Sequence, residues 1–159
     1  MPSPSQKLAT PDAAYQAAKL KGLKGLKGLR VSANFTWLEA FGKCTEAELQ
    51  SFSFTLFKNV AHHAKTMELV RSVFGKPITV TSWVRSKRRN SLVGGSDTSF
   101  HLFGLATDFV VQGFETVAGN LYVQKTLDVL PFMQKCELEW TNGRWTHVAT
   151  ASRRLRPKA

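Results

Sequence analysis

The chain has 159 residues, of which 43% are hydrophobic and 11% aromatic, and it carries a formal net charge of +11. This apolar content excludes general disorder, and no uninterrupted apolar run approaches the roughly 20 residues that span a bilayer. The excess of basic residues predicts attraction to a polyanion, such as nucleic acid, anionic lipid or an anionic polymer of the bacterial envelope.

Both ends of the chain are basic. Residues 1–30 contain a Lys-Gly-Leu repeat from Lys21 to Leu29, and each of its glycines costs about 1 kcal/mol in a helix. We therefore expect residues 1–30 to form a flexible basic arm. This arm has no continuous apolar stretch, so we expect no secretory signal in it. Residues 151–159 are expected to form a basic C-terminal tail.

The globular part is expected to span residues 31–150 and to begin with helices. Thr45 and Glu48 have the spacing of a capping box, and apolar residues recur at steps of three, four or seven from Leu49 to Phe74. This pattern predicts one long helix that ends at Gly75. His62 and His63 lie on this helix, and we interpret them as one solvated and one packed histidine.

The strands are expected late in the chain. The sequence predicts strands at 78–82 and 105–111, an exposed loop at 85–98, a helix within 117–130 that begins after Gly119, and a hairpin. The hairpin strands, 137–140 and 145–150, flank Asn142-Gly143. Helices first and a sheet later indicate an α+β fold, a compact single domain whose small antiparallel sheet packs on helices.

The two cysteines, Cys44 and Cys136, are too few for a disulfide framework and too far apart for a Cys-x-x-Cys zinc site. They could pair with each other. We favour the interpretation that both are small buried hydrophobic residues.

A candidate metal site lies in the segment Ser99-Phe-His101-Leu-Phe-Gly104-Leu-Ala106-Thr-Asp108. His101 and Asp108 are separated by a glycine that lets the chain bend, so both side chains can turn toward one ion. Imidazole and carboxylate are ligands that zinc accepts, and a catalytic zinc site needs three protein ligands. His147 lies in the last predicted hairpin, where a strand can bring it to the other two.

The pattern Ser-x-His-x-x-Gly-x-Ala-x-Asp, followed later by Trp-x-His, resembles the zinc D-alanyl-D-alanine peptidases, which include bacterial carboxypeptidases and phage endolysins. The resemblance covers residues 34–149 and includes Asn34–Glu39, Gly75–Ser82, Arg85, Asn90 and Val93-Gly-Gly95. It implies that zinc is the cofactor and that peptidoglycan is the partner. It also implies site residues: His101, Asp108 and His147 as zinc ligands, Arg85 as the group that grips substrate oxygens, and Ser99 as a hydrogen-bonding residue in the pocket.

One position departs from the family pattern. Many members place the catalytic glutamate three residues before the last histidine, where this chain has Arg144. A branch of the family carries it on the preceding strand, which makes Glu139 the candidate and Glu137 the alternative.

The register of the hairpin decides between these glutamates. A three-residue loop at 142–144 places Glu139 opposite His147, whereas a loop at 141–143 places Glu137 there. A two-residue Asn-Gly turn would leave both glutamates on the far face, as in a module without a catalytic base.

The expected function is that of a zinc metallopeptidase that hydrolyses peptidoglycan stem peptides, of the D,D-carboxypeptidase or the L,D- or D,D-endopeptidase type. We expect a phage endolysin or virion-associated hydrolase that acts at the bacterial cell wall, with its basic ends on anionic envelope polymers. The alternative is a non-catalytic zinc-binding or structural module of the same fold that binds the cell wall. Binding to nucleic acid is the least favoured partner interaction, because only the charge points to it.

Overall fold

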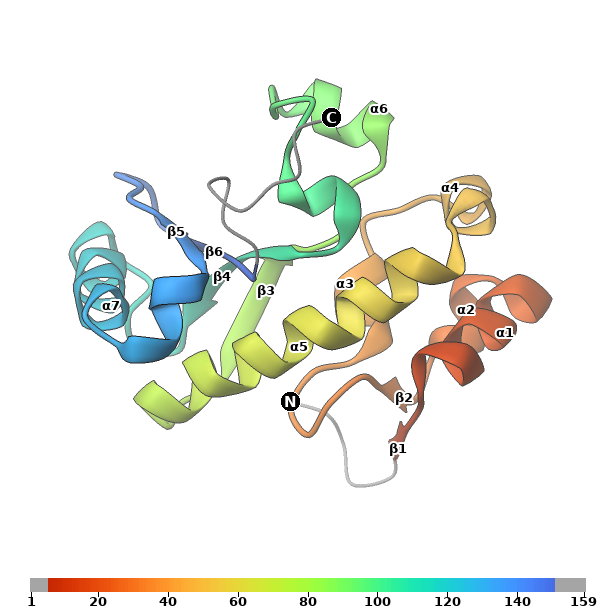
Figure 1. The fold of residues 1–159 in the computed structure, drawn as a ribbon, viewed down its shortest axis with the longest axis horizontal. Helices are drawn as coiled ribbons and strands as arrows, with labels where there is room; N and C mark the ends of the chain where they lie inside the picture. Colours follow the sequence, from red (N-terminus) through yellow and green to blue (C-terminus); the bar gives the residue numbers. More distant parts are fainter. Residues whose placement is uncertain (1–5, 151–159) are drawn as a thin grey trace.

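A four-stranded antiparallel sheet is the centre of the fold in the computed structural model, which describes residues 6–150 (Figure 1). In spatial order the strands are β3 (Ile78–Ser82), β4 (Ala106–Val111), β6 (Thr146–Ala149) and β5 (Glu137–Glu139). The helices are α1 (Pro11–Lys21), α2 (Leu23–Leu26), α3 (Trp37–Phe41), α4 (Glu46–Ser51), α5 (Phe54–Phe74), α6 (Lys87–Leu92) and α7 (Val117–Asp128). Two 3-10 helices, η1 (Phe100–Phe103) and η2 (Pro131–Lys135), and a parallel pair, β1 (Lys7–Leu8) and β2 (Leu29–Arg30), complete it. The predicted α+β fold class is confirmed.

The two faces of the sheet have different chemistry because side chains alternate along each strand. Phe109, Val111 and Val148 belong to the main hydrophobic core, which also contains the buried hydrophobic residues of α5 and α7. The residues directly before Phe109 and Val148, which are Asp108 on β4 and His147 on β6, therefore project from the opposite face. One face of the sheet thus forms the core, and the other is left for a functional site.

Helix α5 is the longest helix and lies between the sheet and the N-terminal helices (Figure 1). Its C-terminus is as predicted: Gly75 adopts φ +59, which a residue without a Cβ reaches at little cost. The predicted single helix from Leu49 to Phe74 is wrong, because α4 ends at Ser51 and the extended Phe52 separates it from α5. The capping box of Thr45 and Glu48 is present, but it begins the short helix α4.

Two further expectations are corrected by the structure. The segment 85–98 is not simply an exposed loop, since it contains α6, whose Asn90 is buried. Helix α7 begins at Val117, before Gly119, because the Thr116 side chain caps its first turn. The predicted hairpin strands are confirmed, with slightly shorter bounds.

The expectation of a flexible arm is wrong for residues 6–30, which fold into β1, α1, α2 and β2. Ala14, Ala18 and Leu26 are fully buried in the main core. The glycines of the repeat serve the fold at defined places: Gly22 ends α1 at φ +63, and a Cβ on Gly25 would lie 2.3 Å from the carbonyl oxygen of Ala17. Close packing and a helix stop, rather than flexibility, explain these two glycines. The predicted C-terminal tail, 151–159, lies outside the described residues.

The remaining sequence interpretations concern single residues. His63 is fully buried and His62 is exposed, as predicted. Cys44 and Cys136 are both free; Cys44 is buried, and burial raises the pKa of its thiol to about 12. Cys136 is only partly buried. Within residues 6–150, no helix has the length and apolar character required to cross a membrane.

The folded N-terminal segment yields a stability prediction. Replacing the fully buried Leu26 with Ala leaves a cavity in the core and should lower the free energy of unfolding by about 2–5 kcal/mol. The matched control is Leu20→Ala, because Leu20 is 81% exposed and its removal should change stability by no more than about 0.5 kcal/mol. Urea unfolding followed by circular dichroism measures both. Equal stability of the two variants would show that residues 6–30 behave as an arm.

Candidate metal centre

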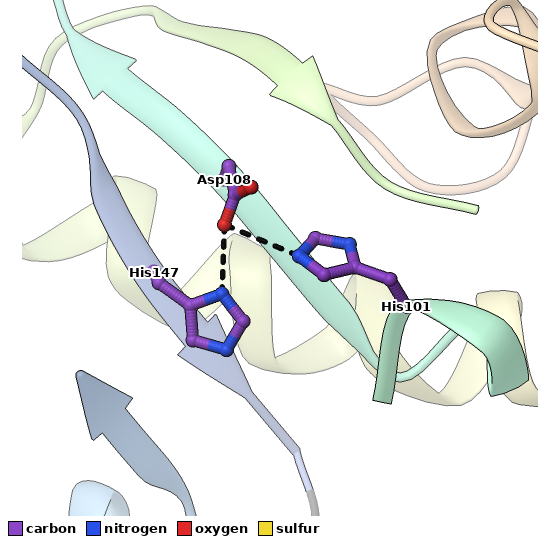
Figure 2. Close-up of side chains that lie close together, drawn as sticks. All are labelled: His101, Asp108 and His147. Atoms are coloured by element: carbon purple, nitrogen blue, oxygen red, sulfur yellow. Dashed lines mark hydrogen bonds and ion pairs between the residues drawn. The ribbon is translucent and has the colours of Figure 1, made fainter. Parts of the chain in front are cut away.

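Three elements bring His101, Asp108 and His147 together on the free face of the sheet (Figure 2). His101 comes from η1, Asp108 from β4 and His147 from β6, and Asp108 is the direct cross-strand partner of His147. Asp108 Oδ1 lies 3.2 Å from His101 Nε2 and 2.7 Å from His147 Nδ1. All three residues are buried, so they form a compact donor set rather than a solvated cluster. The predicted ligands are thus brought together.

The orientation of His101 suits a cation between the three side chains. Its Nδ1 lies 2.7 Å from the carbonyl oxygen of Trp83, which can only accept, so Nδ1 donates. In a neutral imidazole the other nitrogen, Nε2, then presents a lone pair toward the Asp108 carboxylate. Two nitrogens and one carboxylate oxygen are donors that zinc accepts, and a backbone carbonyl behind a ligating histidine is the usual orienting partner. The residues therefore fit a zinc ion.

Asp108 uses its second oxygen to bind Arg85. Arg85 Nη2 donates to Asp108 Oδ2 over 2.8 Å, and Arg85 Nε donates to Ser82 Oγ on β3. Burial by itself raises the pKa of Asp108, but the hydrogen bonds and charges of His101 and His147 outweigh it and lower the pKa well below its usual range. Asp108 is therefore a carboxylate whose two oxygens are held in fixed directions.

His63 supports the same strand from the opposite face. Its Nε2 lies 2.8 Å from Thr107 Oγ1, on the residue before Asp108, and its ring packs edge-on against Trp83 at 5.4 Å between centroids. Burial lowers the pKa of His63 well below its ordinary value, and the charges of His101 and His147 lower it further. His63 is therefore a neutral structural histidine behind the metal centre.

The hairpin register places both candidate glutamates beside the metal centre. Glu139 is paired with His147 across the ladder, and Glu137 with Ala149, which is the register of the three-residue loop. Because the two glutamates are two residues apart on one strand, they share a face. A carboxylate oxygen of each and an imidazole nitrogen of His147 lie within 4.8 Å of one another. The two-residue turn that would have turned the glutamates away is excluded.

The turn is fixed by helix α7. The fully buried Gln124 donates from Nε2 to Thr141 Oγ1 at 3.0 Å and accepts from the Thr141 amide at 3.1 Å. Thr141 Oγ1 in turn donates to the carbonyl oxygen of Trp145. These bonds close the loop at 142–144 and so set the register that brings Glu139 to His147.

An open cleft of about 290 Å³ contains the metal group and the other predicted site residues. Ser99 is buried at its edge and has a second role, since its Oγ accepts from the His101 amide and caps η1. The lining residues are Arg85, Gly94, Gly95, Ser96, Ser99, Phe100, His101, Asp108, Glu137, Glu139, Thr141, Trp145 and His147. All predicted site residues therefore line one cleft.

Sequence reasoning missed the residues that hold this site in place. Trp83 acts through its backbone carbonyl, for which no side-chain pattern exists. In the sequence, Gln124 is an ordinary polar residue of a predicted helix. Its role in fixing the turn at Thr141 becomes evident only from its complete burial in the structure. The sequence predicts that His63 is packed, but its position beside Thr107 depends on how α5 crosses the sheet.

The buried His63 predicts a pH dependence of stability. Its pKa is lower in the folded chain than in the unfolded chain, where it is near 6.5, so the unfolded state binds more protons and stability should fall as the pH drops below about 6.5. The loss attributable to His63 can reach about 1.4 kcal/mol per pH unit. His63→Gln should flatten the fall between pH 6.5 and 4.5, measured by urea unfolding. The exposed His62, changed to Gln, should retain the wild-type slope; identical slopes for the two variants would contradict the assignment.

A comparison with known families agrees with the site. The model of the Peptidase M15 family matches residues 33–149, a range that contains all three candidate ligands, Arg85, Ser99 and both glutamates. A search of curated proteins found no match. The family consists of zinc metallopeptidases, and His101, Asp108 and His147 form a possible metal-binding group in the structure. The chain belongs to the Peptidase M15 family, of the zinc D-alanyl-D-alanine carboxypeptidase type.

Proposed function

We propose that the protein is a zinc-dependent peptidase that hydrolyses peptidoglycan stem peptides. The observation that carries this proposal is the position of Glu139, which is paired with His147 and lines the same cleft as the metal-binding group. A zinc site with a carboxylate at its side is the arrangement of a hydrolase that activates water. The family membership supports a peptidase and a peptidoglycan substrate.

His101, Asp108 and His147 would hold the zinc ion, with His101 oriented by the Trp83 carbonyl. When bound, zinc supplies Lewis-acid polarisation of the scissile carbonyl and lowers the pKa of water. The carboxylate of Glu139 accepts the proton of the attacking water and returns it to the leaving amine nitrogen. This sequence requires no covalent bond between the enzyme and the substrate.

Arg85 has two roles in this proposal. Its Nη2 holds Asp108 Oδ2, while its Nη1 has no hydrogen-bond partner within residues 6–150 and belongs to a side chain that lines the cleft. A planar guanidinium can hold one carboxylate with one edge and offer a further N–H to a substrate oxygen. Arg85 would therefore stabilise the negative charge that develops on the substrate carbonyl. Ser99 Oγ offers a further hydrogen bond from the cleft edge.

The finer biological role is proposed from charge and fold together. We infer that the protein acts at the bacterial cell wall, as a phage endolysin or virion-associated hydrolase. A net charge of +11 favours residence on the phosphate- and carboxylate-rich polymers of the envelope. The exposed lysines of the N-terminal repeat, Lys21, Lys24 and Lys27, are candidates for that contact.

Removing a ligand should abolish zinc binding and cleavage together. His101→Ala removes the imidazole whose Nε2 faces Asp108, so the zinc content measured by elemental analysis should fall from about one ion per chain to near zero. Release of peptide from purified cell walls should disappear in parallel. The exposed His62, changed to Ala, controls for loss of any histidine and should keep both properties. Cleavage by a zinc-free His101→Ala variant would overturn the metal assignment.

Replacing each glutamate with glutamine tests which of the two is the catalytic base. Glu139→Gln removes the proposed base without changing its size, so kcat should fall by about 10²–10⁴-fold while zinc content is retained. Glu137→Gln is the matched control on the same strand face and should lose far less. The opposite ranking would assign the base to Glu137, and full activity in both variants would exclude both. Zinc binding without any wild-type turnover would favour the non-catalytic module.

A further inference from the structure

One part of the cleft is lined by main chain rather than by long side chains. Gly94, Gly95 and Ser96 line it together with Arg85 and Ser99. These three residues follow α6, and the proposed mechanism gives them no role. Their position beside the substrate-binding residues makes them candidates for contact with the substrate.

Asn90 fixes this segment from α6. Its backbone carbonyl accepts from the Gly95 amide at 2.8 Å, and its side-chain Nδ2 donates to the Ser96 carbonyl oxygen at 2.9 Å. Asn90 is only 3% exposed, and its bond to the exposed Ser96 is partly buried. A single buried residue therefore fixes two consecutive positions of the cleft lining.

The contact between Asn90 and Gly95 also keeps the lining free of side chains. A Cβ on Gly95 would lie 2.0 Å from Asn90 Oδ1 and 2.7 Å from its Cγ, so no other residue fits at position 95 while Asn90 stays in place. Gly94 adopts φ +71, which also disfavours a side chain. Asn90 Oδ1 has no hydrogen-bond partner within residues 6–150, and leaving this buried oxygen unpaired costs free energy of folding.

The fixed segment presents unused backbone groups. Within residues 6–150, the carbonyl oxygens of Gly94 and Gly95 accept no hydrogen bond, and the Ser96 amide donates none. Free main-chain donors and acceptors in a cleft can pair with the peptide groups of an extended ligand, as the edge of a sheet does. Such a surface recognises a peptide by its backbone.

We propose that Gly94, Gly95 and Ser96 form a subsite that binds the main chain of the stem peptide, and that Asn90 is the positioning residue that holds this subsite. The proposal rests on the proposed function, because that function supplies the peptide ligand. Asn90 acts through the segment and does not touch the reacting atoms.

The test compares Gly95→Ala, Asn90→Ala and Asn90→Asp with the control Ser91→Ala. Asp keeps the shape of Asn but lacks the Nδ2 donor and adds a negative charge, so it breaks the bond to the Ser96 carbonyl oxygen without removing side-chain volume. Ser91 is an exposed neighbour on α6 whose carbonyl, but not its side chain, accepts from the Gly94 amide. Three quantities are measured with a stem pentapeptide: KM and kcat of the zinc-loaded enzyme, and the Kd of the metal-free protein by calorimetry. Zinc content and thermal unfolding are recorded for every variant.

The three test variants should raise KM and Kd by about tenfold or more, with kcat falling less and zinc content unchanged. Ser91→Ala should match the wild type. In the double variant Asn90→Ala/Gly95→Ala the Cβ no longer meets an amide, so the second substitution should cost less than it does alone. Gly95→Ala changes one methyl group in a loop, so it remains informative even where an Asn90 variant fails to fold.

Wild-type Kd and KM in a folded Gly95→Ala variant would overturn the subsite. If Asn90 has a purely structural role, its variants should have a lower unfolding temperature but wild-type Kd and KM. This result would also overturn the proposal. A wild-type protein that neither binds nor cleaves the pentapeptide contradicts the proposed function, and the subsite with it. A wild-type protein that does both while the folded variants match it contradicts the subsite alone.

Discussion

The Asp108 carboxylate is the interaction on which the rest of the site depends. One oxygen faces both histidines and the other binds Arg85, so a single side chain fixes the spacing of a metal-binding group and the direction of Arg85, the proposed substrate-binding residue. This works only because β4 is central in the site: it pairs with β3, which leads into Arg85, and with β6, which carries His147. A carboxylate on an edge strand would have lacked one of these neighbours.

The centre is also stabilised from behind. On the core face of β4, His63 binds Thr107 and packs against Trp83, while the Trp83 carbonyl holds His101 on the opposite face. Packing of α5 on the sheet is therefore coupled to the orientation of a metal ligand. A change that shifts α5 by a fraction of an ångström would move Trp83 and, through it, His101, even though α5 contributes no residue to the cleft lining.

The sequence predicted the parts of this molecule that short-range patterns encode. The strand alternation at 78–82, the capping box at Thr45, and the spacing of His101 and Asp108 each have a local physical cause, and each is found. The sequence alone allows three hairpin registers, because the choice between them depends on Gln124, a residue of another element. The flexible arm was a wrong prediction for a related reason: glycine allows both flexibility and tight packing, and only the neighbours of Gly22 and Gly25 decide between them.

The family match and the folded core of this chain begin at different residues. The family match begins at residue 33, whereas the continuous core of the structure already includes Ala14, Ala18 and Leu26. The range of the family match is therefore shorter than the part of the chain that packs into the core. A protein cut at the family boundary would expose the surface of α5 that Tyr15 and its neighbours cover, including the fully buried Phe57. The segment before residue 33 is thus part of the folded core, and its positive charge is carried by a structural part of the enzyme.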